Sequence, residues 1–354
     1  MSGTKEIQTG SRAARSALRQ AARYAIASSI TAGVFLSVAA LTPAAQAATA
    51  QAATSSSSAS SASAAKTTAR IQALLDNPAG GTVNLPSGTF NVRPRLVLHQ
   101  GERIVGHHTT LRVASGSGNY AVMLTGASTA TDLSGLTITG VTFDQNASGN
   151  PIRSVPALFK GSPRFVMRFL LGSGIKIVND RFIGTDNVNT IVTGGGTGNV
   201  TISRNVFKTI NTPLHDHSSI YTSGTGTVIS NNTLAGRAAY YSAAIEVHGD
   251  KVSVTGNHVS GYFRGANIVG SDAKFTGNHI SGAGSPVDLW SVAPTALHNV
   301  TVTGNVLNRN LPYWRGIVHR LGLRMPAANF TRQVIRDAVS TLSFRNITVH
   351  ANSR

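Results

Sequence analysis

The sequence predicts an all-β protein, a single-stranded right-handed parallel β-helix, on the strength of three observations. One short phrase returns between residues 199 and 310, and the asparagines within it are 27, 25, 21 and 27 residues apart. Repeats of this period are units that bury their apolar faces only by stacking on one another. Each unit is rich in Val, Ile and Thr with alternating polarity, which indicates a strand. The recurring asparagine indicates a turn whose amide bonds to the coils above and below it; the five are Asn205, Asn232, Asn257, Asn278 and Asn305.

The first 47 residues have the composition of a secretory signal peptide. Five Lys and Arg residues precede an apolar run over 25–41, and Ala45-Gln-Ala47 supplies the small residues that signal peptidase requires. The apolar run is short and contains four hydroxyl residues, which argues against stable insertion in a membrane. We therefore expect a secreted protein, extracellular or periplasmic.

Residues 48–65 contain almost only Ala, Ser, Thr and Gln, so we expect a flexible linker there and one β-helix domain over 66–354. The chain has no cysteine, so the stack of coils must provide the stability without disulfides. Removing the leader takes five of the 31 bases and one of the 13 acids, which leaves a formal charge of +14. This charge favours anionic partners, and nucleic acid is not expected among them because no nucleic-acid motif accompanies it.

The amino-terminal end of the domain carries a phrase of known type. Ile71 to Leu75 predicts a short helix, and Gly81-Thr-Val-Asn-Leu-Pro86-Ser-Gly88-Thr-Phe90 follows it. These residues, with the repeats, resemble the entry segment of the pectate-lyase-like β-helix superfamily over roughly 66–354. The resemblance implies a helix that caps the open end of the first coil. It does not imply one activity, because this fold supports lyases, hydrolases, epimerases, tailspikes and adhesins.

Earlier copies of the repeat are expected at Leu136–Phe143 and Ile175–Phe182, where Val141 and Asp180 take the place of the asparagine. The 39 residues between those two positions exceed one coil, which predicts a protruding loop over 144–173. That loop would carry four basic residues and three phenylalanines, either as a basic rim or packed on the coil; they are Arg153, Lys160, Arg164, Arg168, Phe159, Phe165 and Phe169.

The carboxyl-terminal end is predicted to contain an inserted helix. The interval from Asn305 to Asn352 is too long for one coil, and Ala328–Ser340 has apolar residues at helical spacing. A helix there would cover the last coil and protect its strand edge, and a final coil would follow at Phe344–His350.

A second recurring phrase predicts where chemistry lies. Taking Ile191, Ile220, Ile245, Ala266 and Val287 as inward positions, the period of two turns their neighbours outward. The first outward column is then Val192, Tyr221, Glu246, Asn267 and Asp288, and the second, two residues on, is Gly194, Ser223, His248, Val269 and Trp290. Outward strand positions are usually filled by Thr, Ser, Lys or Val. Here the acids, a histidine and aromatic residues gather, and Glu246 is one of two glutamates after the leader.

Such columns fit the handling of a polysaccharide. In the resembled families saccharide lies along a parallel strand face, and Trp290 and Tyr221 would stack on sugar rings. For hydrolysis, Glu246 and Asp288 are two coils, about 9.6 Å, apart along the stack, which suits inversion. For elimination or epimerisation of a uronate, Asn267 and Arg264 would neutralise the carboxylate and His248, His217 or Tyr221 would remove the proton.

His215-Asp216-His217 lies in the turn just before the Ser219–Ser223 strand. It would supply a general base with its orienting acid, or part of a metal site with Glu246, although His-x-His spacing alone is a weak metal signal. The alternative is a loop whose side chains satisfy one another by hydrogen bonds. Tyr241 and Tyr262 precede their strands in the same way and would form subsite walls, or pack in turns. His258 and His279 follow the ladder asparagines on another side of the coil and are expected to be structural.

No motif of the resembled families transfers an activity to this chain. The expectation is a secreted lyase, hydrolase or epimerase acting on an anionic polysaccharide, with a non-catalytic glycan-binding or adhesion protein as the alternative. Neither scheme requires a cofactor, and calcium is the one cofactor that the resembled families would allow.

Overall fold

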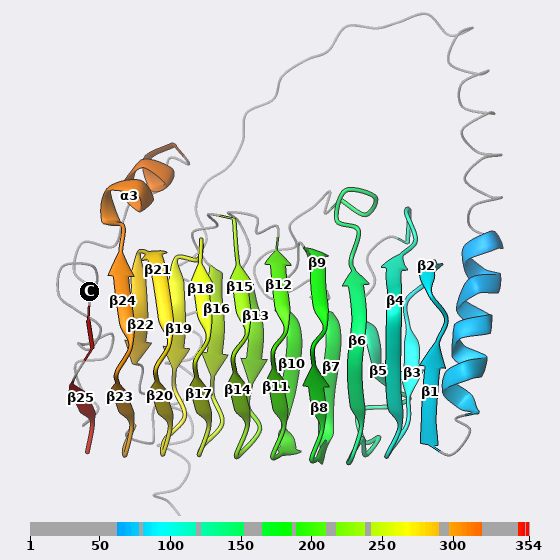
Figure 1. The fold of residues 1–354 in the computed structure, drawn as a ribbon, viewed down its shortest axis with the longest axis horizontal. Coiled ribbons are helices and arrows are strands. Elements are labelled where there is room, and N and C mark those ends of the chain that lie inside the picture. Colours follow the sequence, from blue (N-terminus) through cyan, green and yellow to red (C-terminus); the bar gives the residue numbers. More distant parts are fainter. Residues whose placement is uncertain are drawn as a thin grey trace, which may run out of the picture. The chain divides into compact units, whose positions relative to one another are not determined.

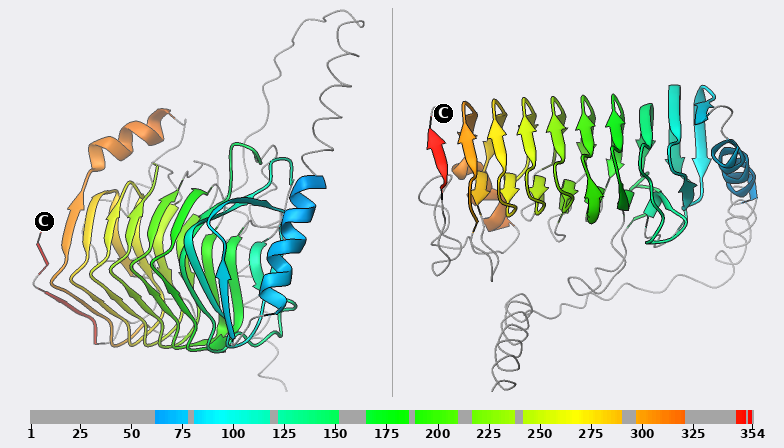
Figure 2. Two further views of the ribbon diagram at one scale, coloured as in Figure 1. Left: turned by 45° about the vertical axis from the view of Figure 1, so that its right-hand side comes forward. Right: turned by 90° about the horizontal axis from the view of Figure 1, so that it is seen from below.

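The computed structural model describes residues 62–77, 81–117, 122–151, 165–185, 189–209, 217–237, 242–289, 297–320, 346–350 and 352–353. Within them the chain forms a right-handed parallel β-helix whose coils stack side by side from β1 to β25 (Figure 1). Most coils contribute one strand to an eight-stranded sheet and two short strands to a 17-stranded sheet that bends between them. Figure 2 shows this repeating cross-section along the stack. The predicted fold class is confirmed.

The eight-stranded sheet, called sheet B here, has the order β22-β19-β16-β13-β10-β7-β5-β3. Its strands are β3 (Leu96–Leu98), β5 (Val122–Gly126), β7 (Phe165–Ser173), β10 (Asn189–Gly198), β13 (His217–Thr222), β16 (Ser242–Val247), β19 (Arg264–Ile268) and β22 (Ser285–Leu289).

The 17-stranded sheet, called sheet A, begins with β1 (Thr82–Leu85), β2 (Gly88–Val92), β4 (Arg103–Val113) and β6 (Thr137–Asp144). Before its bend follow β8 (Lys176–Val178), β11 (Thr201–Ser203), β14 (Val228–Ser230), β17 (Ser253–Thr255), β20 (Lys274–Thr276), β23 (Thr301–Thr303) and β25 (Thr348–His350). After the bend follow β9 (Arg181–Thr185), β12 (Val206–Thr209), β15 (Thr233–Ala235), β18 (His258–Ser260), β21 (His279–Ala283) and β24 (Val306–Arg309).

The bend of sheet A contains the recurring asparagines, which form a hydrogen-bonded ladder. Asn232 is typical: its Oδ1 accepts from the backbone N–H and the Nδ2 of Asn205 at 2.9 and 3.1 Å. Its Nδ2 donates to Asn257 Oδ1 at 2.9 Å and to the carbonyl of Ile202 at 2.9 Å. The ladder therefore satisfies buried amides that the bend removes from the strand pairing. Its members are Asp180, Asn205, Asn232, Asn257, Asn278, Asn305 and Asn352.

The residue before the ladder asparagine explains why four of the repeats read Gly-Asn or Asn-Asn; Arg204, before Asn205, is the exception and has a φ of 55° as well. Asn231, Gly256, Gly277 and Gly304 all have φ between 55° and 65°. This left-handed region is open to glycine and tolerated by asparagine. Inside the bend the core is stacked as well, since the Phe182 and Phe207 rings are parallel with centroids 4.7 Å apart.

The amino-terminal helix spans residues 62–76, so it begins four residues inside the segment expected to be a linker. Its polar side chains complete the edge of the first coil. Gln72 accepts from the Val97 N–H at 2.8 Å and donates to the Val97 carbonyl at 3.0 Å, as a neighbouring strand would. Asp76 Oδ1 lies 2.9 Å from His99 Nε2. The helix thus blocks an edge that would otherwise pair with other chains.

At the other end, α3 (Leu311–Arg320) confirms the prediction of a helix inserted between Asn305 and Asn352, but it lies earlier than the predicted range Ala328–Ser340, which is outside the described residues. Asn310 caps the amino-terminal end of α3, because its Oδ1 accepts the Tyr313 N–H at 3.2 Å. Pro312 occupies the first turn of the helix. These two residues are a start signal for a helix. Trp314 is fully buried, contacts the Phe263 ring edge-on and donates to the Gly282 carbonyl at 2.7 Å.

The last nine residues of the loop expected over 144–173 form a strand instead, β7 (Phe165–Ser173). Phe169 is fully buried inside the coil, and Phe165 is buried against Val122 and Val192. Arg153, Phe159, Lys160 and Arg164 lie outside the described residues. The last coil at Phe344–His350 is confirmed in its described part, where β25 pairs with β23.

Asp180 is the acidic member of the ladder and predicts a pH-dependent stability. It is 1% exposed, and burial raises its pKa from 3.8 to about 8. Oδ1 accepts the Val141 N–H at 2.8 Å, while Oδ2 is buried without a hydrogen-bond partner in the described structure. A protonated carboxyl can donate, as the Nδ2 of the other members does.

Because the folded pKa is raised, the native state keeps a proton that the unfolded chain releases above pH 4. The free energy of unfolding should therefore fall as pH rises from about 4 to 8, by about 1.4 kcal/mol per unit of pKa shift. Asp180→Asn has no carboxyl to titrate at this position. The amount by which its free energy of unfolding in urea exceeds that of wild type should therefore grow from pH 5 to pH 8. The control is Asp272→Asn, at a partly exposed turn where Oδ1 accepts from Asn299 Nδ2 at 2.8 Å. An Asp180→Asn advantage that does not change with pH would contradict this account.

Candidate functional site

The outer face of sheet B carries the predicted column in the predicted register. Tyr221 pairs with Glu246, Glu246 with Asn267 and Asn267 with Asp288. Their chain neighbours at the inward positions, Ile220, Ile245, Ala266 and Val287, are fully buried. The strand spacing therefore brings four chemically distinct side chains side by side, about 4.8 Å apart along the stack.

The first half of these strands departs from the period of two. Ser219 would face outward with Tyr221 under that rule, but it is fully buried and its Oγ lies 2.6 Å from the Tyr262 hydroxyl. Gly265 is also inward: a Cβ there would lie 2.4 Å from the Pro286 carbonyl oxygen. The residues just before them, Ser218 and Arg264, contact the column instead. Sequence periodicity alone therefore missed Ser218 and Ser285.

Glu246 is the best-anchored residue of the column. Its Oε2 accepts a hydrogen bond from Ser218 Oγ at 2.5 Å, and its Oε1 lies 2.8 Å from His248 Nε2. Burial works to raise the pKa of Glu246. The hydrogen bonds from His248 and Ser218 and the charges of His248 and Arg264 outweigh it, so the pKa lies below its ordinary value. Glu246 is consequently a fixed carboxylate and a poor proton donor at neutral pH.

His248 occupies the second outward column, where the strand ends. Its side chain is 30% exposed, whereas that of Glu246 is 17% exposed. The ring stacks on Tyr221, with centroids 4.8 Å apart and planes at 29°. Gly249 follows, and a Cβ there would lie 2.1 Å from the Gly224 carbonyl oxygen, so only glycine permits this tight turn. The chain thus leaves the sheet directly after presenting the imidazole.

Asp288 lies two coils beyond Glu246 and has its own partners. Arg264 Nε is 3.1 Å from Asp288 Oδ2, with both side chains 25% exposed. The Ser285 hydroxyl donates to Asp288 Oδ1. Arg264 also lies over the Phe263 ring, 5.7 Å from its centroid. The ion pair is therefore half-buried and held from both sides.

Asn267 stands between the two carboxylates. Its Nδ2 lies 3.5 Å from Glu246 Oε1, at the limit of a hydrogen bond. Its Oδ1 is buried and has no hydrogen-bond partner in the described part of the chain.

The other predicted site residues do not all join this cluster. Tyr262 is fully buried inside the coil, so the expectation that it forms a subsite wall is wrong: the departure from period two turns it inward to Ser219. His217 begins β13 and pairs with Ser242, and its side chain is not described. His215, Asp216, Tyr241 and Trp290 lie outside the described residues.

His258 and His279 lie one coil apart on the outer face of sheet A, away from the column, as expected. Among the described residues, no three His, Asp or Glu side chains gather as metal ligands would. A search of the same residues finds no helix with the length and apolar character that crossing a membrane requires.

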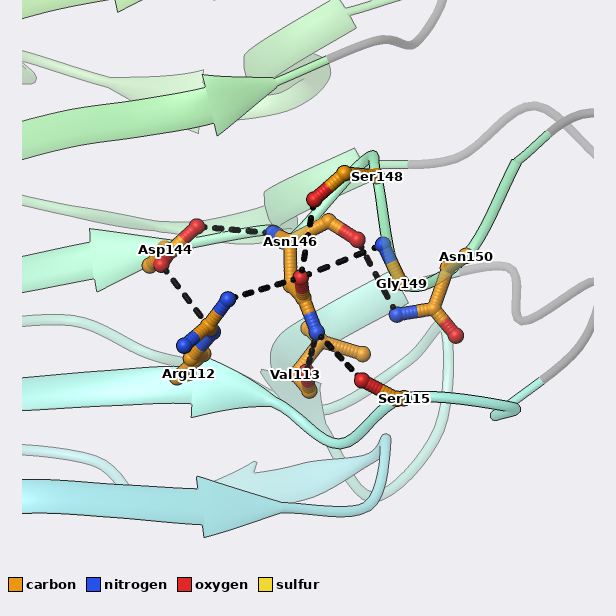
Figure 3. Close-up of polar contacts among 8 residues, drawn as sticks. All are labelled: Arg112, Val113, Ser115, Asp144, Asn146, Ser148, Gly149 and Asn150. Carbon is orange, nitrogen blue, oxygen red and sulfur yellow. Dashed lines mark hydrogen bonds and ion pairs between the residues drawn. The ribbon is translucent and has the colours of Figure 1, made fainter.

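A second polar cluster lies at the end of β6, on sheet A (Figure 3). Asn146 donates to the Val113 carbonyl at 2.9 Å and accepts from Arg112 Nη2 at 3.0 Å and from the Gly149 N–H at 3.2 Å. Asp144 accepts the Asn146 N–H at 2.8 Å and lies 3.3 Å from Arg112 Nε. These bonds hold the turn after β6 against β4. The cluster is therefore a structural clamp.

The comparisons with known proteins show the fold. A variant tailspike protein of the E. coli bacteriophage HK620 in complex with hexasaccharide is 16% identical over 80% of this chain and 52% of its own, with a TM-score of 0.65. A second variant, with pentasaccharide, is 17% identical over 69% and 47%, with a TM-score of 0.59. The chain spans about half the length of these tailspikes. The Streptococcus pneumoniae surface protein and adhesin PfbA is 14% identical over 68% and 72%, with a TM-score of 0.48. No family model and no curated protein matches the sequence.

Ser218→Ala tests whether the serine holds Glu246. A hydrogen bond to a buried carboxylate contributes about 1.5–3 kcal/mol, so we expect a loss of that size in the free energy of unfolding at pH 7. Because the folded pKa of Glu246 is lowered, this contribution is present above the ordinary pKa and disappears as pH falls through the folded one. Denaturant unfolding at pH 7 and at acidic pH measures it. The control is Ser253→Ala, on the outer face of sheet A, and equal losses in both variants would refute the assignment.

Proposed function

We propose that this protein is an exported enzyme that cleaves an anionic polysaccharide by β-elimination on the outer face of sheet B. The observation that carries the proposal is the Glu246–His248 pair: Nε2 of the imidazole, whose side chain is 30% exposed, lies 2.8 Å from a carboxylate that Ser218 fixes from the other side. A general base needs a partner that orients it, and Glu246 supplies that partner.

The roles of the two residues follow from burial and protonation. Glu246 is the more buried and its lowered pKa keeps it ionised, so it orients the imidazole and stabilises the imidazolium that forms. With Nε2 facing Glu246, Nδ1 is the nitrogen that meets substrate; no hydrogen bond to it occurs within the described structure. The stacked Tyr221 ring fixes the plane of the imidazole.

The reaction has three coupled changes. His248 Nδ1 takes the proton from C5 of a uronate, the C4–O bond to the leaving sugar breaks, and a C4–C5 double bond forms. The leaving oxygen takes a proton from the Tyr221 hydroxyl or from solvent. Negative charge builds on the uronate carboxylate as the C5 proton leaves, and Arg264 and Asn267 lie one coil from Glu246 to oppose it. Epimerisation at C5 shares the first step and keeps the C4–O bond.

Three further observations support an anionic polysaccharide as substrate. The chain after the leader has a formal charge of +14, which attracts polyanions. The tailspike structures with which it shares its fold are complexes with oligosaccharides. The first 47 residues have the composition of a secretory signal, which would bring the protein to extracellular or periplasmic glycans.

Hydrolysis is the second candidate, and one observation favours it. Glu246 and Asp288 lie on one column two coils apart, about 9.6 Å along the stack, near the separation of inverting carboxylate pairs. The similar tailspike structures are of variants in which a glutamate or an aspartate is replaced. Simple glycan binding by the same face is the non-enzymatic alternative.

The experiment incubates the protein lacking residues 1–47 with a panel of acidic and neutral polysaccharides. Ultraviolet absorbance of unsaturated products and new reducing ends are followed together. We expect both to rise on a uronate polymer. New ends without absorbance would contradict elimination and favour Glu246 with Asp288 as hydrolytic residues. If neither signal rises and no deuterium exchanges at C5, both enzymatic reactions are contradicted and glycan binding without catalysis remains.

His248→Ala should lower kcat by about 10²–10⁴-fold, the usual contribution of a general base. Glu246→Gln keeps the shape but loses the carboxylate that orients the ring, and should lower kcat by up to about 10⁴-fold. His258→Ala is the matched control, because it removes an exposed histidine from the outer face of sheet A. Wild-type kcat in His248→Ala would contradict the proposal.

A further inference from the structure

Arg168 extends the column of the candidate site toward the amino-terminal end of the stack. It pairs with Thr125 on one side and Val192 on the other, and Val192 pairs with Tyr221. Arg168 is therefore three coils, or about 14 Å, from Glu246 on the same outer face. The sequence offered it only as part of a loop, because the start of β7 was not foreseen.

Among the described residues, Arg168 lies against an aromatic ring and an apolar cluster. Its guanidinium carbon lies 5.6 Å from the centroid of the Phe165 ring. Phe165 and Val192 form a buried cluster with Val122 on this face, and Tyr221 packs against it. A guanidinium over an aromatic face is held in a defined plane by cation–π attraction.

Within the described structure Arg168 has no anionic partner. The described ion pairs involve Arg112, Arg264 and two histidines, and none of them includes Arg168. Its Nε is buried and makes no hydrogen bond in the described part of the chain. Buried polar groups of native proteins are nearly always paired, so an unpaired one on a functional face points to a ligand.

We infer that Arg168 binds the carboxylate of a sugar unit that lies three coils from the reacting one, and so determines that the polymer must be anionic there. The planar fork of a guanidinium matches a carboxylate with two parallel hydrogen bonds. The inference rests on the proposed function and names the substrate class of that face.

The distribution of charge along the column then gives the polymer a preferred position. Arg168 places a positive charge at one end, while Glu246 and Asp288 place carboxylates at the other. A carboxylate-bearing chain gains from the first and is repelled by the second unless Arg264 compensates. Oligomers too short to reach from His248 to Arg168 should therefore bind weakly.

The test is calorimetric binding of an oligouronate long enough to span the column, compared with the same oligomer after reduction of its carboxylates to alcohols. Arg168→Ala should lose about tenfold or more in affinity for the acidic oligomer, the value of a charged hydrogen bond. Its affinity for the reduced oligomer should equal that of wild type. Arg168→Lys keeps the charge without the fork and should be intermediate. In turnover, Arg168→Ala should raise KM more than it changes kcat.

Arg181→Ala is the matched control, since it removes an arginine from the outer face of sheet A. Equal affinity of wild type and Arg168→Ala for the acidic oligomer would overturn the inference, as would an equal loss in Arg181→Ala. Thermal unfolding of each variant shows whether it is folded. If Arg168→Ala is not folded, the affinity of Arg168→Lys for the acidic oligomer tests the inference instead. A wild type that binds the acidic oligomer through Arg168 but turns over no polymer refutes the proposed reaction and keeps this subsite.

Discussion

The asparagine at the bend of each coil is the constraint on which the other features depend. One Asn232 side chain joins the coil before it, through Asn205 and Ile202, to the coil after it, through Asn257. These bonds are buried and directional, so neighbouring coils can stack in one register only. A slip of one residue would reverse the inward and outward sides of every strand. The same chain of bonds therefore specifies the positions of side chains on sheet B, a different side of the coil.

The candidate site illustrates how a solenoid brings residues that are distant in the sequence into contact. Ser218 and Glu246 are 28 residues apart and Arg264 and Asp288 are 24 apart, yet each pair is in hydrogen-bond contact. Each contact joins successive coils or strands, so the function of a column is distributed over several repeats. Within the column the two side chains differ in burial: the Glu246 carboxylate is the more buried, and the His248 imidazole is the more exposed to solvent. A polymer that lies along the stack meets the positive, aromatic and acidic parts in sequence.

Much of the fold and of the column on sheet B could be predicted from the sequence, because the coil repeat and the alternation within strands are both regular. The 21–27 residue repeat gives the coils, and the period of two gives the register of Tyr221, Glu246, Asn267 and Asp288. What periodicity could not give are the departures from it. Ser219 and Gly265 face inward against the period of two, while Ser218 contacts Glu246 and Tyr262 is buried in the core. The start of β7 had no repeat to mark it, so Arg168 was assigned to a loop. Helix α3 had a signal, Asn310 with Pro312, that lay outside any repeat.

The central claim is that the column on sheet B binds and cleaves an anionic glycan. A crystal structure of the His248→Ala variant without its leader, soaked with a long oligouronate, tests it most directly. The account predicts sugar units along the outer face of β13, β16, β19 and β22, with C5 of one unit facing position 248 and a carboxylate at Arg168. An oligosaccharide bound on sheet A instead, or one whose C5 lies far from position 248, would contradict it.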